Sequence, residues 1–156
     1  MTRPIGTSQA WLARHQKSAG AARSLLREFL ASIDSGQRFL DIGQLVLSEL
    51  VSNAVQHARM PGRLIFVRFE MEPGLLRIEV HDASRRIPMM RTTGDEDESG
   101  RGLRLVDQLA KEWGVSPREG GVGKAVWALL APADEGCAVS TDQTAQHQQE
   151  AEESAR

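Results

Sequence analysis

The sequence has few aromatic residues and almost no cysteine. Phe and Trp together make up 4% of the 156 residues and Tyr is absent, so the core must be built from Leu, Val, Ile and Ala. The single cysteine, Cys137, cannot form an intramolecular disulfide, and no cysteine–histidine cluster has the spacing of a zinc site. These absences exclude a disulfide-stabilised scaffold and a zinc-binding module.

Long hydrophobic runs are missing as well. No apolar run approaches the ~20 residues that a helix needs to span a bilayer, and the N-terminus has no signal-peptide core. We therefore expect a cytoplasmic protein that does not enter a membrane. With 40% hydrophobic and 26% charged residues, the chain is long enough for one globular domain and too short for two.

Charge is unevenly distributed along the chain. The formal net charge is −2, but the segment from Ala133 onward holds six acidic residues and one basic residue, which gives it −5 and leaves +3 for the rest. This segment has almost no apolar bulk, so we predict a disordered tail over residues 133–156. Because the +3 body lacks interleaved aromatic and basic residues, we do not expect direct binding to nucleic acid.

Two stretches carry apolar residues at helical spacing. Residues 17–33 form the first, which stops at an Asp-Ser-Gly sequence, and residues 39–58 form the second, which stops at Met-Pro-Gly. The stripes expected to be buried are Ala22, Leu25, Leu26, Phe29, Leu30 and Ile33 on the first helix and Leu47, Leu50, Val51, Ala54 and Ala58 on the second.

Alternating apolar and polar residues predict four strands. Residues 64–71 and 75–81 are joined by a Glu-Pro-Gly connection short enough for a β-hairpin. Residues 113–116 and 125–131 form a second pair across a glycine-rich turn, after a short helix that begins at Leu103. Helices on one face of a mixed, mostly antiparallel sheet make a two-layer α+β sandwich.

The composition also suggests where the domain begins and ends. We assign residues 1–16 to an N-terminal arm, residues 17–132 to the folded domain and residues 133–156 to the tail. Residues 82–99 have no periodicity and contain Pro88 and a run of four acids. A stretch of this length without structure inside a compact domain is usually a functional loop or a lid.

Three polar residues share one face of the second predicted helix. Glu49, Asn53 and His57 are spaced i, i+4 and i+8, so about 40° separates each from the next at ~3.6 residues per turn. A carboxylate, a carboxamide and an imidazole in a column can form a metal or phosphate site, and they can equally form a solvated helix face. Other parts of the chain must decide between these interpretations.

Two further features bear on a nucleotide site. Gly100 and Gly102 precede the short helix, where glycine lets backbone N–H groups approach an anion. Asp82 ends a strand, where its carboxylate can accept a hydrogen bond from an exocyclic amine such as that of adenine, although aspartate is also a common turn residue. The chain has no P-loop, because Ala125 follows its Gly-Lys pair, and no dinucleotide fingerprint, because Leu105 replaces the third glycine.

Together these features resemble the GHKL (Bergerat-fold) ATPase superfamily, in particular the compact anti-sigma-factor serine kinases of actinobacteria. The pattern is Glu-x-x-x-Asn on a helix, then Asp after a strand, then a loop ending in Gly-x-Gly-Leu at a helix start. The matching stretches are LVLSELVSNAVQHA, LLRIEVHDASRRIP, SGRGLRLVDQLAKEWGV and GKAVWALL, and they fall in order within residues 10–131. The resemblance implies the Bergerat ATP-binding fold, with ATP and Mg²⁺ as cofactors.

The resemblance also implies a role for each matching residue. Asn53 would bind a Mg²⁺ ion that bridges the ATP phosphates, and Glu49 would act as general base toward an attacking serine hydroxyl. Asp82 would accept a hydrogen bond from adenine. These roles suit phosphoryl transfer, which depends mainly on positioning and charge neutralisation. The phosphates would be held under the lid by the backbone of four consecutive residues: Gly100, Arg101, Gly102 and Leu103.

Some positions depart from the family pattern. The adenine box is commonly Asp-x-Gly-x-Gly, but Ser84 and Arg86 replace both glycines, so the base pocket must differ or be narrower. Ala125 stands near the last strand, where a hydroxyl residue is common. We expect Lys124 and the arginines of the lid to be solvated.

Two functions of different classes are consistent with these residues. The first is a serine protein kinase of the anti-sigma type, which sequesters a sigma factor and phosphorylates an anti-anti-sigma partner of the STAS class. Relatives in this family often form homodimers, so the resemblance carries that expectation. The second is a non-catalytic interaction module that uses a nucleotide only to set its shape, or has lost it. A sensor histidine kinase is not expected, because the segment before the first helix is too short for a dimerisation domain.

Overall fold

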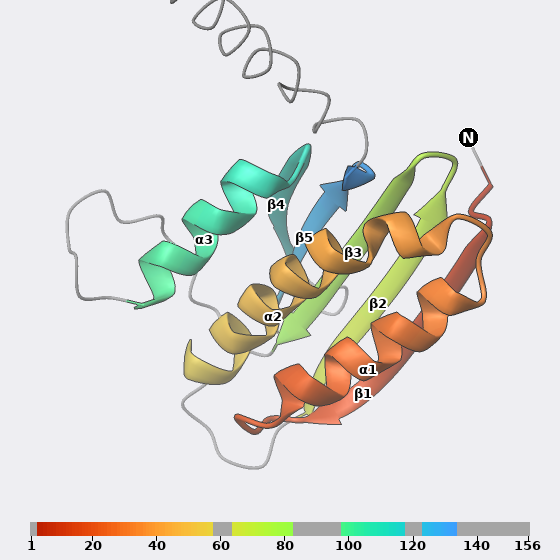
Figure 1. Cartoon of the computed structure of the whole chain (residues 1–156). Coiled ribbons are helices and arrows are strands. Elements are labelled where there is room, and N and C mark those ends of the chain that lie inside the picture. The colour runs from red at the N-terminus through yellow and green to blue at the C-terminus, as the bar shows by residue number, and fades with distance from the viewer. Residues whose placement is uncertain (1–2, 58–63, 83–97, 118–122, 134–156) are drawn as a thin grey trace, which may run out of the picture.

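The structure, a computed structural model, describes residues 3–57, 64–82, 98–117 and 123–133, and for residues 57 and 98–102 it describes the backbone alone. The elements are labelled in Figure 1. In chain order they are β1 (Gly6–Ala13), α1 (Ser18–Ala31), the 3-10 helix η1 (Gly36–Phe39), α2 (Leu40–His57), β2 (Leu64–Glu72), β3 (Leu75–Asp82), α3 (Glu98–Leu109), β4 (Glu112–Pro117) and β5 (Lys124–Leu130).

The five strands form one sheet in the order β1-β2-β3-β5-β4. Every neighbouring pair is antiparallel, and β2 and β3 form the predicted hairpin, with Gly74 at a φ of 75° in its turn. The helices lie together on one side of the sheet (Figure 1). The predicted two-layer α+β sandwich is confirmed, with an entirely antiparallel sheet.

Strand alternation decides which side chains enter the core. Burial alternates residue by residue in β2 and β3, as a period of two requires for a sheet covered on one face. The buried strand residues meet the apolar stripes of α1 and α2 in one cluster. Of the predicted helix stripes, Ala22, Leu26, Phe29, Leu30, Leu47, Leu50, Val51 and Ala54 are buried, Leu25 and Ile33 are partly buried, and Ala58 lies outside the described residues.

The first strand is missing from the sequence prediction, which placed residues 1–16 in an arm outside the domain. In the structure β1 pairs with β2 along its whole length, from Gly6 opposite Met71 to Ala13 opposite Leu64. Its residues alternate between half-buried and exposed, and none is fully buried. Only Trp11 and Leu12 of this edge strand are large and apolar, and they are neighbours, so the strand lacks the apolar alternation by which strands are recognised in a sequence. The prediction of an arm is therefore wrong over residues 6–13, which belong to the sheet.

Helix ends also differ from the predictions. The second predicted helix begins as η1 and continues as α2. α3 begins at Glu98, so Gly100 and Gly102 lie inside its first turns instead of before them. Most of the predicted lid and nearly all of the predicted tail lie outside the described residues.

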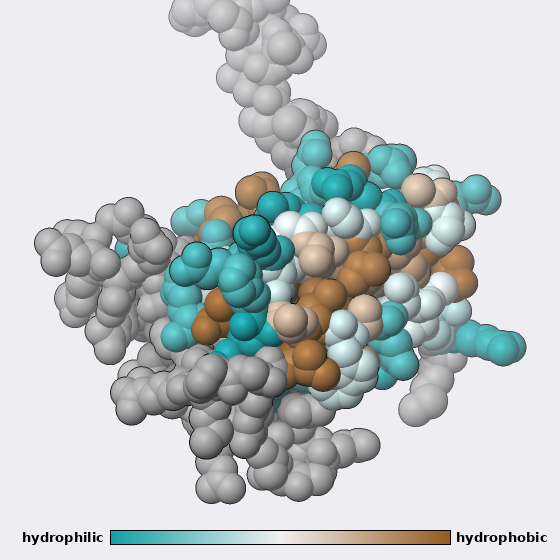
Figure 2. Space-filling view, turned by 90° about the horizontal axis from the view of Figure 1, so that it is seen from below, coloured by the Kyte–Doolittle hydropathy of each residue, from teal (hydrophilic) through white to brown (hydrophobic). Residues whose placement is uncertain are grey.

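The surface is not uniformly polar. Figure 2 shows, on the face seen from below, hydrophobic residues that reach the surface in a band between hydrophilic margins. Among the described residues, the large apolar side chains with more than half of their surface exposed are Ile5, Trp11, Leu45 and Leu64. In the described part of the chain, no helix is both long and apolar enough to cross a membrane.

Candidate functional site

The buried stripe of α2 fixes the rotation of this helix and so the direction of its polar face. Glu49 and Asn53 are one turn apart on α2, next to the core residues Leu50 and Ala54. Asn53 is 9% exposed and Glu49 is half-buried. The side chain of His57, the third residue of the predicted column, lies outside the described residues. The structure thus places the two residues that the sequence singled out at the border between core and surface.

Asn53 is a buried amide without a hydrogen-bond partner in the described part of the chain. Its Nδ2 is covered and makes no hydrogen bond to any described residue. A buried donor left unsatisfied costs about 1–3 kcal/mol, and buried polar groups in folded proteins are almost always paired. Nδ2 therefore suits an acceptor that a ligand supplies, such as a phosphate oxygen, and the amide's other atom, Oδ1, is the kind of hard oxygen that Mg²⁺ prefers. The buried donor thus fits the phosphate part of the role that the family resemblance implies, and the role of Asn53 as a Mg²⁺ ligand stays a prediction.

Asp82 lies on the same side of the sheet as α2. It is the last residue of β3 and 3% exposed, and it continues the buried series of Ile78 and Val80. Those two residues belong to the cluster that also holds the stripe of α2. A carboxylate buried at a strand end, beneath the helix layer, can select a ligand by accepting a hydrogen bond.

Lys124 of β5 lies beside Asp82 on the neighbouring strand, and the sequence analysis did not predict this pair. The two residues are directly opposite in the β3–β5 register, with Nζ 4.0 Å from Oδ2 of Asp82. Burial lowers the pKa of Lys124 from its ordinary value, and the carboxylate of Asp82 opposes part of that shift. The expectation that Lys124 is solvated is therefore wrong, because only 7% of it is exposed.

The sequence does contain a signal for this burial. Val126, Ala128 and Leu130 are buried at alternate positions of β5, and Lys124 continues that series by one step. The alternation outweighs the usual preference of lysine for solvent, because the register of the whole strand is set by its apolar residues.

α3 contributes the third predicted part of the site. Leu103 and Val106 are 2% and 0% exposed, which fixes α3 against the rest of the domain. The backbone of residues 100–102 is helical, so its N–H groups belong to the first turns of a helix, where an anion is favoured. Ser84 and Arg86 of the altered adenine box lie outside the described residues, and the roles of residues 100–103 stay predictions.

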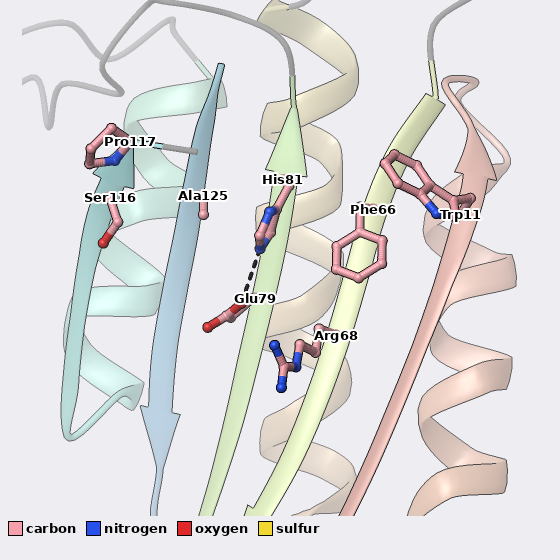
Figure 3. A pocket seen from close by; sticks show the side chains of 8 residues that line it. All are labelled: Trp11, Phe66, Arg68, Glu79, His81, Ser116, Pro117 and Ala125. Carbon is pink, nitrogen blue, oxygen red and sulfur yellow. Dashed lines mark hydrogen bonds and ion pairs between the residues drawn. The ribbon is translucent and has the colours of Figure 1, made fainter. Parts of the chain in front are cut away.

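The other face of the sheet carries a separate pocket, of about 520 Å³, that sequence reasoning did not predict. Its side chains project from the strands on the side away from the helices (Figure 3). The rings of Trp11 and Phe66 are 5.0 Å apart, and the His81 ring meets Phe66 edge-on at 5.1 Å. The residues that line this pocket are Trp11, Phe66, Arg68, Glu79, His81, Ser116, Pro117 and Ala125.

On this open face, Glu79 makes polar contacts with His81 and Arg77. Its Oε2 lies 3.0 Å from Nε2 of His81, and its Oε1 accepts a hydrogen bond of 2.8 Å from Nε of Arg77. The hydrogen bond from His81, followed by the hydrogen bond and charge of Arg77, outweighs burial and lowers the pKa of Glu79 to about 2. Its carboxylate stays charged at neutral pH, and it is separated by the sheet from Asn53 and Asp82.

With this geometry established, the chain can be compared with known proteins. Residues 12–129 match the family described as the histidine kinase-like ATPase domain. The chain belongs to this family. This histidine kinase-like ATPase domain is also similar to an uncharacterised protein of Streptomyces coelicolor, with 36% identity over 75 residues, or 46% of this chain and 70% of that protein.

A solved structure shares the fold. The domain is similar to the crystal structure of the RsbU and RsbW domains of Rv1364c from Mycobacterium tuberculosis, with a TM-score of 0.62 and 22% sequence identity. The similarity covers 83% of this chain and 33% of that chain, so this chain spans about a third of its solved neighbour. At this level of identity the likeness establishes the fold alone.

Proposed function

We propose that this domain binds Mg·ATP on the helix-covered side of the sheet and acts as an anti-sigma regulator in the cytoplasm. It sequesters a sigma factor and transfers the γ-phosphoryl group of ATP to a serine of an anti-anti-sigma partner of the STAS class. The observation that carries the proposal is the buried Nδ2 of Asn53, which has no hydrogen-bond partner among the described residues and lies one turn from Glu49. Membership in the histidine kinase-like ATPase family supports the choice of nucleotide, and the resemblance of the sequence motifs to anti-sigma-factor serine kinases supports the anti-sigma role.

The chain's own residues divide the work of phosphoryl transfer. Asn53 would hold the metal ion, which would neutralise charge on the phosphate oxygens. Among the described residues no group of three His, Cys, Asp or Glu could hold a metal. Mg²⁺ is commonly held by one or two protein ligands together with the phosphates of a substrate, and Asn53 would supply one such ligand. Glu49 takes the proton from the serine hydroxyl as the serine oxygen attacks the γ-phosphorus, and the bond from that phosphorus to the bridging oxygen breaks and releases ADP.

The remaining contacts bind and orient the nucleotide. Asp82 accepts a hydrogen bond from the amine of adenine, and the helical backbone at Gly100 and Gly102 faces the phosphates with the N-terminal end of a helix dipole. Placing the reacting groups in this way supplies most of the rate enhancement in phosphoryl transfer. As in relatives of the family, the protein works as a homodimer in this proposal.

A phosphoryl-transfer assay tests the kinase. The protein is incubated with Mg²⁺, radiolabelled ATP and purified STAS proteins, and transfer to serine is measured. We expect transfer by the wild type and a loss of at least about 100-fold in Glu49→Gln, since general-base catalysis contributes typically 10²–10⁴-fold. Glu28→Gln, which alters an exposed glutamate of α1, is the matched control and should transfer normally. No transfer by the wild type, or equal transfer by Glu49→Gln, overturns the kinase.

The second candidate is a non-catalytic interaction module in the form that has lost its nucleotide; a module that binds ATP only to set its shape is distinguished from the kinase by the transfer assay. Lys124 favours this candidate, because it offers the carboxylate of Asp82 a charge partner even without a nucleotide. If this function is correct, calorimetric titration with ATP gives no heat, and Asp82→Ala leaves the interaction with the partner proteins unchanged. Saturable ATP binding that Asp82→Ala abolishes rules it out in favour of the ATP-binding regulator.

A further inference from the structure

The buried ammonium group beside Asp82 has no role in the function proposed so far. We propose that Lys124 is a second base-reading residue, which donates a hydrogen bond to ring nitrogen N1 of adenine while Asp82 accepts one from the amine at C6. This inference rests on the proposed ATP-binding function, and it adds a specificity-determining residue to the same site.

The position of Lys124 supports this role. It is the direct cross-strand partner of Asp82, and both side chains point to the helix-covered side of the sheet. Their side chains are 9% and 4% exposed, with 4.0 Å between Nζ and Oδ2. A base that reaches the carboxylate of Asp82 therefore also comes within reach of Nζ of Lys124.

The burial of a lysine at this place needs a reason. Removing an ammonium group from water is expensive, and here it lowers the pKa of Lys124. One reason is Asp82, because an apolar residue at position 124 would leave its buried carboxylate without this charge partner. The ammonium group has three N–H donors, so it can serve Asp82 and a ligand together.

The chemistry of the base matches this pair. Adenine presents a donor at C6 and an acceptor at N1, side by side on one edge. An acceptor at Asp82 and a donor at Lys124 are complementary to that order. Guanine presents the reverse order, an acceptor at C6 and a donor at N1. With guanine in the orientation described for adenine, like groups would face each other at both positions, so in that orientation the pair favours ATP over GTP.

Nucleotide analogues test the inference in the wild-type protein. Calorimetry in Mg²⁺ compares ATP with 1-deaza-ATP, which keeps the amine but has a C–H in place of N1, and with GTP. We expect 1-deaza-ATP to bind about tenfold or more weakly than ATP, the size of a lost hydrogen bond to a charged group, and GTP to bind more weakly still. Equal binding of ATP and 1-deaza-ATP, or of ATP and GTP, overturns the inference while the ATP site stands.

A variant provides the second arm of the test. In Lys124→Met the ratio between ATP and 1-deaza-ATP should fall to one, whereas Lys111→Met, which alters an exposed lysine, should keep the wild-type ratio. A ratio that Lys124→Met leaves unchanged means that Lys124 is structural and overturns the inference. If Lys124→Met does not fold, the wild-type comparison still decides. If the wild type does not bind ATP at all, the proposed function fails, and the inference with it.

Discussion

At the scale of single residues, a substitution of Asn53 distinguishes a binding role of this residue from a structural one. Because Nδ2 of Asn53 has no partner among the described residues, a substitution that removes this nitrogen breaks no hydrogen bond that it makes in the folded protein. We predict that Asn53→Ala changes the free energy of unfolding by less than about 1 kcal/mol but weakens Mg·ATP binding about tenfold or more. Urea denaturation and calorimetry measure the two quantities.

The matched control for this prediction is Asn53→Asp. It keeps an oxygen ligand at the same position, so it should retain binding to ATP in the presence of Mg²⁺. A loss of more than about 2 kcal/mol of stability in Asn53→Ala, with unchanged ATP affinity, would show that the amide is a structural element of the core.

The lowered pKa of Glu79 predicts how the stability of the fold changes in acid. Its pKa falls from 4.5 in the unfolded chain to about 2 in the fold, so its stabilising contribution is complete above pH 4.5 and is lost as the pH falls toward 2. After allowance for solvent at this pocket, we expect it to be about 1–2 kcal/mol. Unfolding measured between pH 5 and pH 2 should show less dependence on pH in Glu79→Gln than in the wild type. The same dependence in both would contradict the ion network, and Glu112→Gln, an exposed control, should behave as wild type.

At the scale of elements, two glycines near the first helix should respond in opposite ways to substitution by alanine. A Cβ on Gly36 would overlap the carbonyl oxygen of Leu30 and lie 2.9 Å from its carbonyl carbon, and this backbone cannot move aside. Gly20 lies within α1, and a Cβ there meets only the end of the Arg23 side chain at 3.6 Å. We predict that Gly36→Ala loses about 2–3 kcal/mol of stability.

We expect Gly20→Ala to gain about 0.5–1 kcal/mol, because alanine costs less entropy to fix in a helix. Urea denaturation of both variants decides. Equal effects on the two variants would mean that the turn between α1 and η1 adapts to the added methyl group.

The elements that could be predicted from the sequence are those with a strong periodic signal. The apolar stripe around Leu50 and the hairpin turn at Gly74 each combine a period with a stop signal, and both are present in the structure. β1 was missed because an edge strand has few buried side chains, so its sequence needs no alternation of apolar and polar residues to pair with β2. Its place in the sheet depends on a partner that begins more than fifty residues later in the chain.

At the scale of the whole molecule, the sheet separates two kinds of chemistry. The helix-covered side holds Asn53, Asp82 and Lys124 at the border of the core, and the open side holds the aromatic and ionic pocket around Glu79. The sequence motif was enough to single out Asn53 and Asp82 as candidates, because each belongs to a short local pattern, and the structure buries both of them. Lys124 and the open-face pocket could not be predicted in that way, since they arise from register across strands that are distant in sequence.

The central claim, that this histidine kinase-like ATPase domain binds Mg·ATP through Asn53 and Asp82, is tested most directly by one titration. ATP is titrated calorimetrically into the wild-type protein, first with Mg²⁺ and then with EDTA in its place. We predict a saturable heat with one site per chain in Mg²⁺ and an affinity at least about tenfold lower in EDTA, because a metal held at Asn53 joins protein and phosphates. A flat titration in Mg²⁺, or the same affinity in EDTA, would contradict the account.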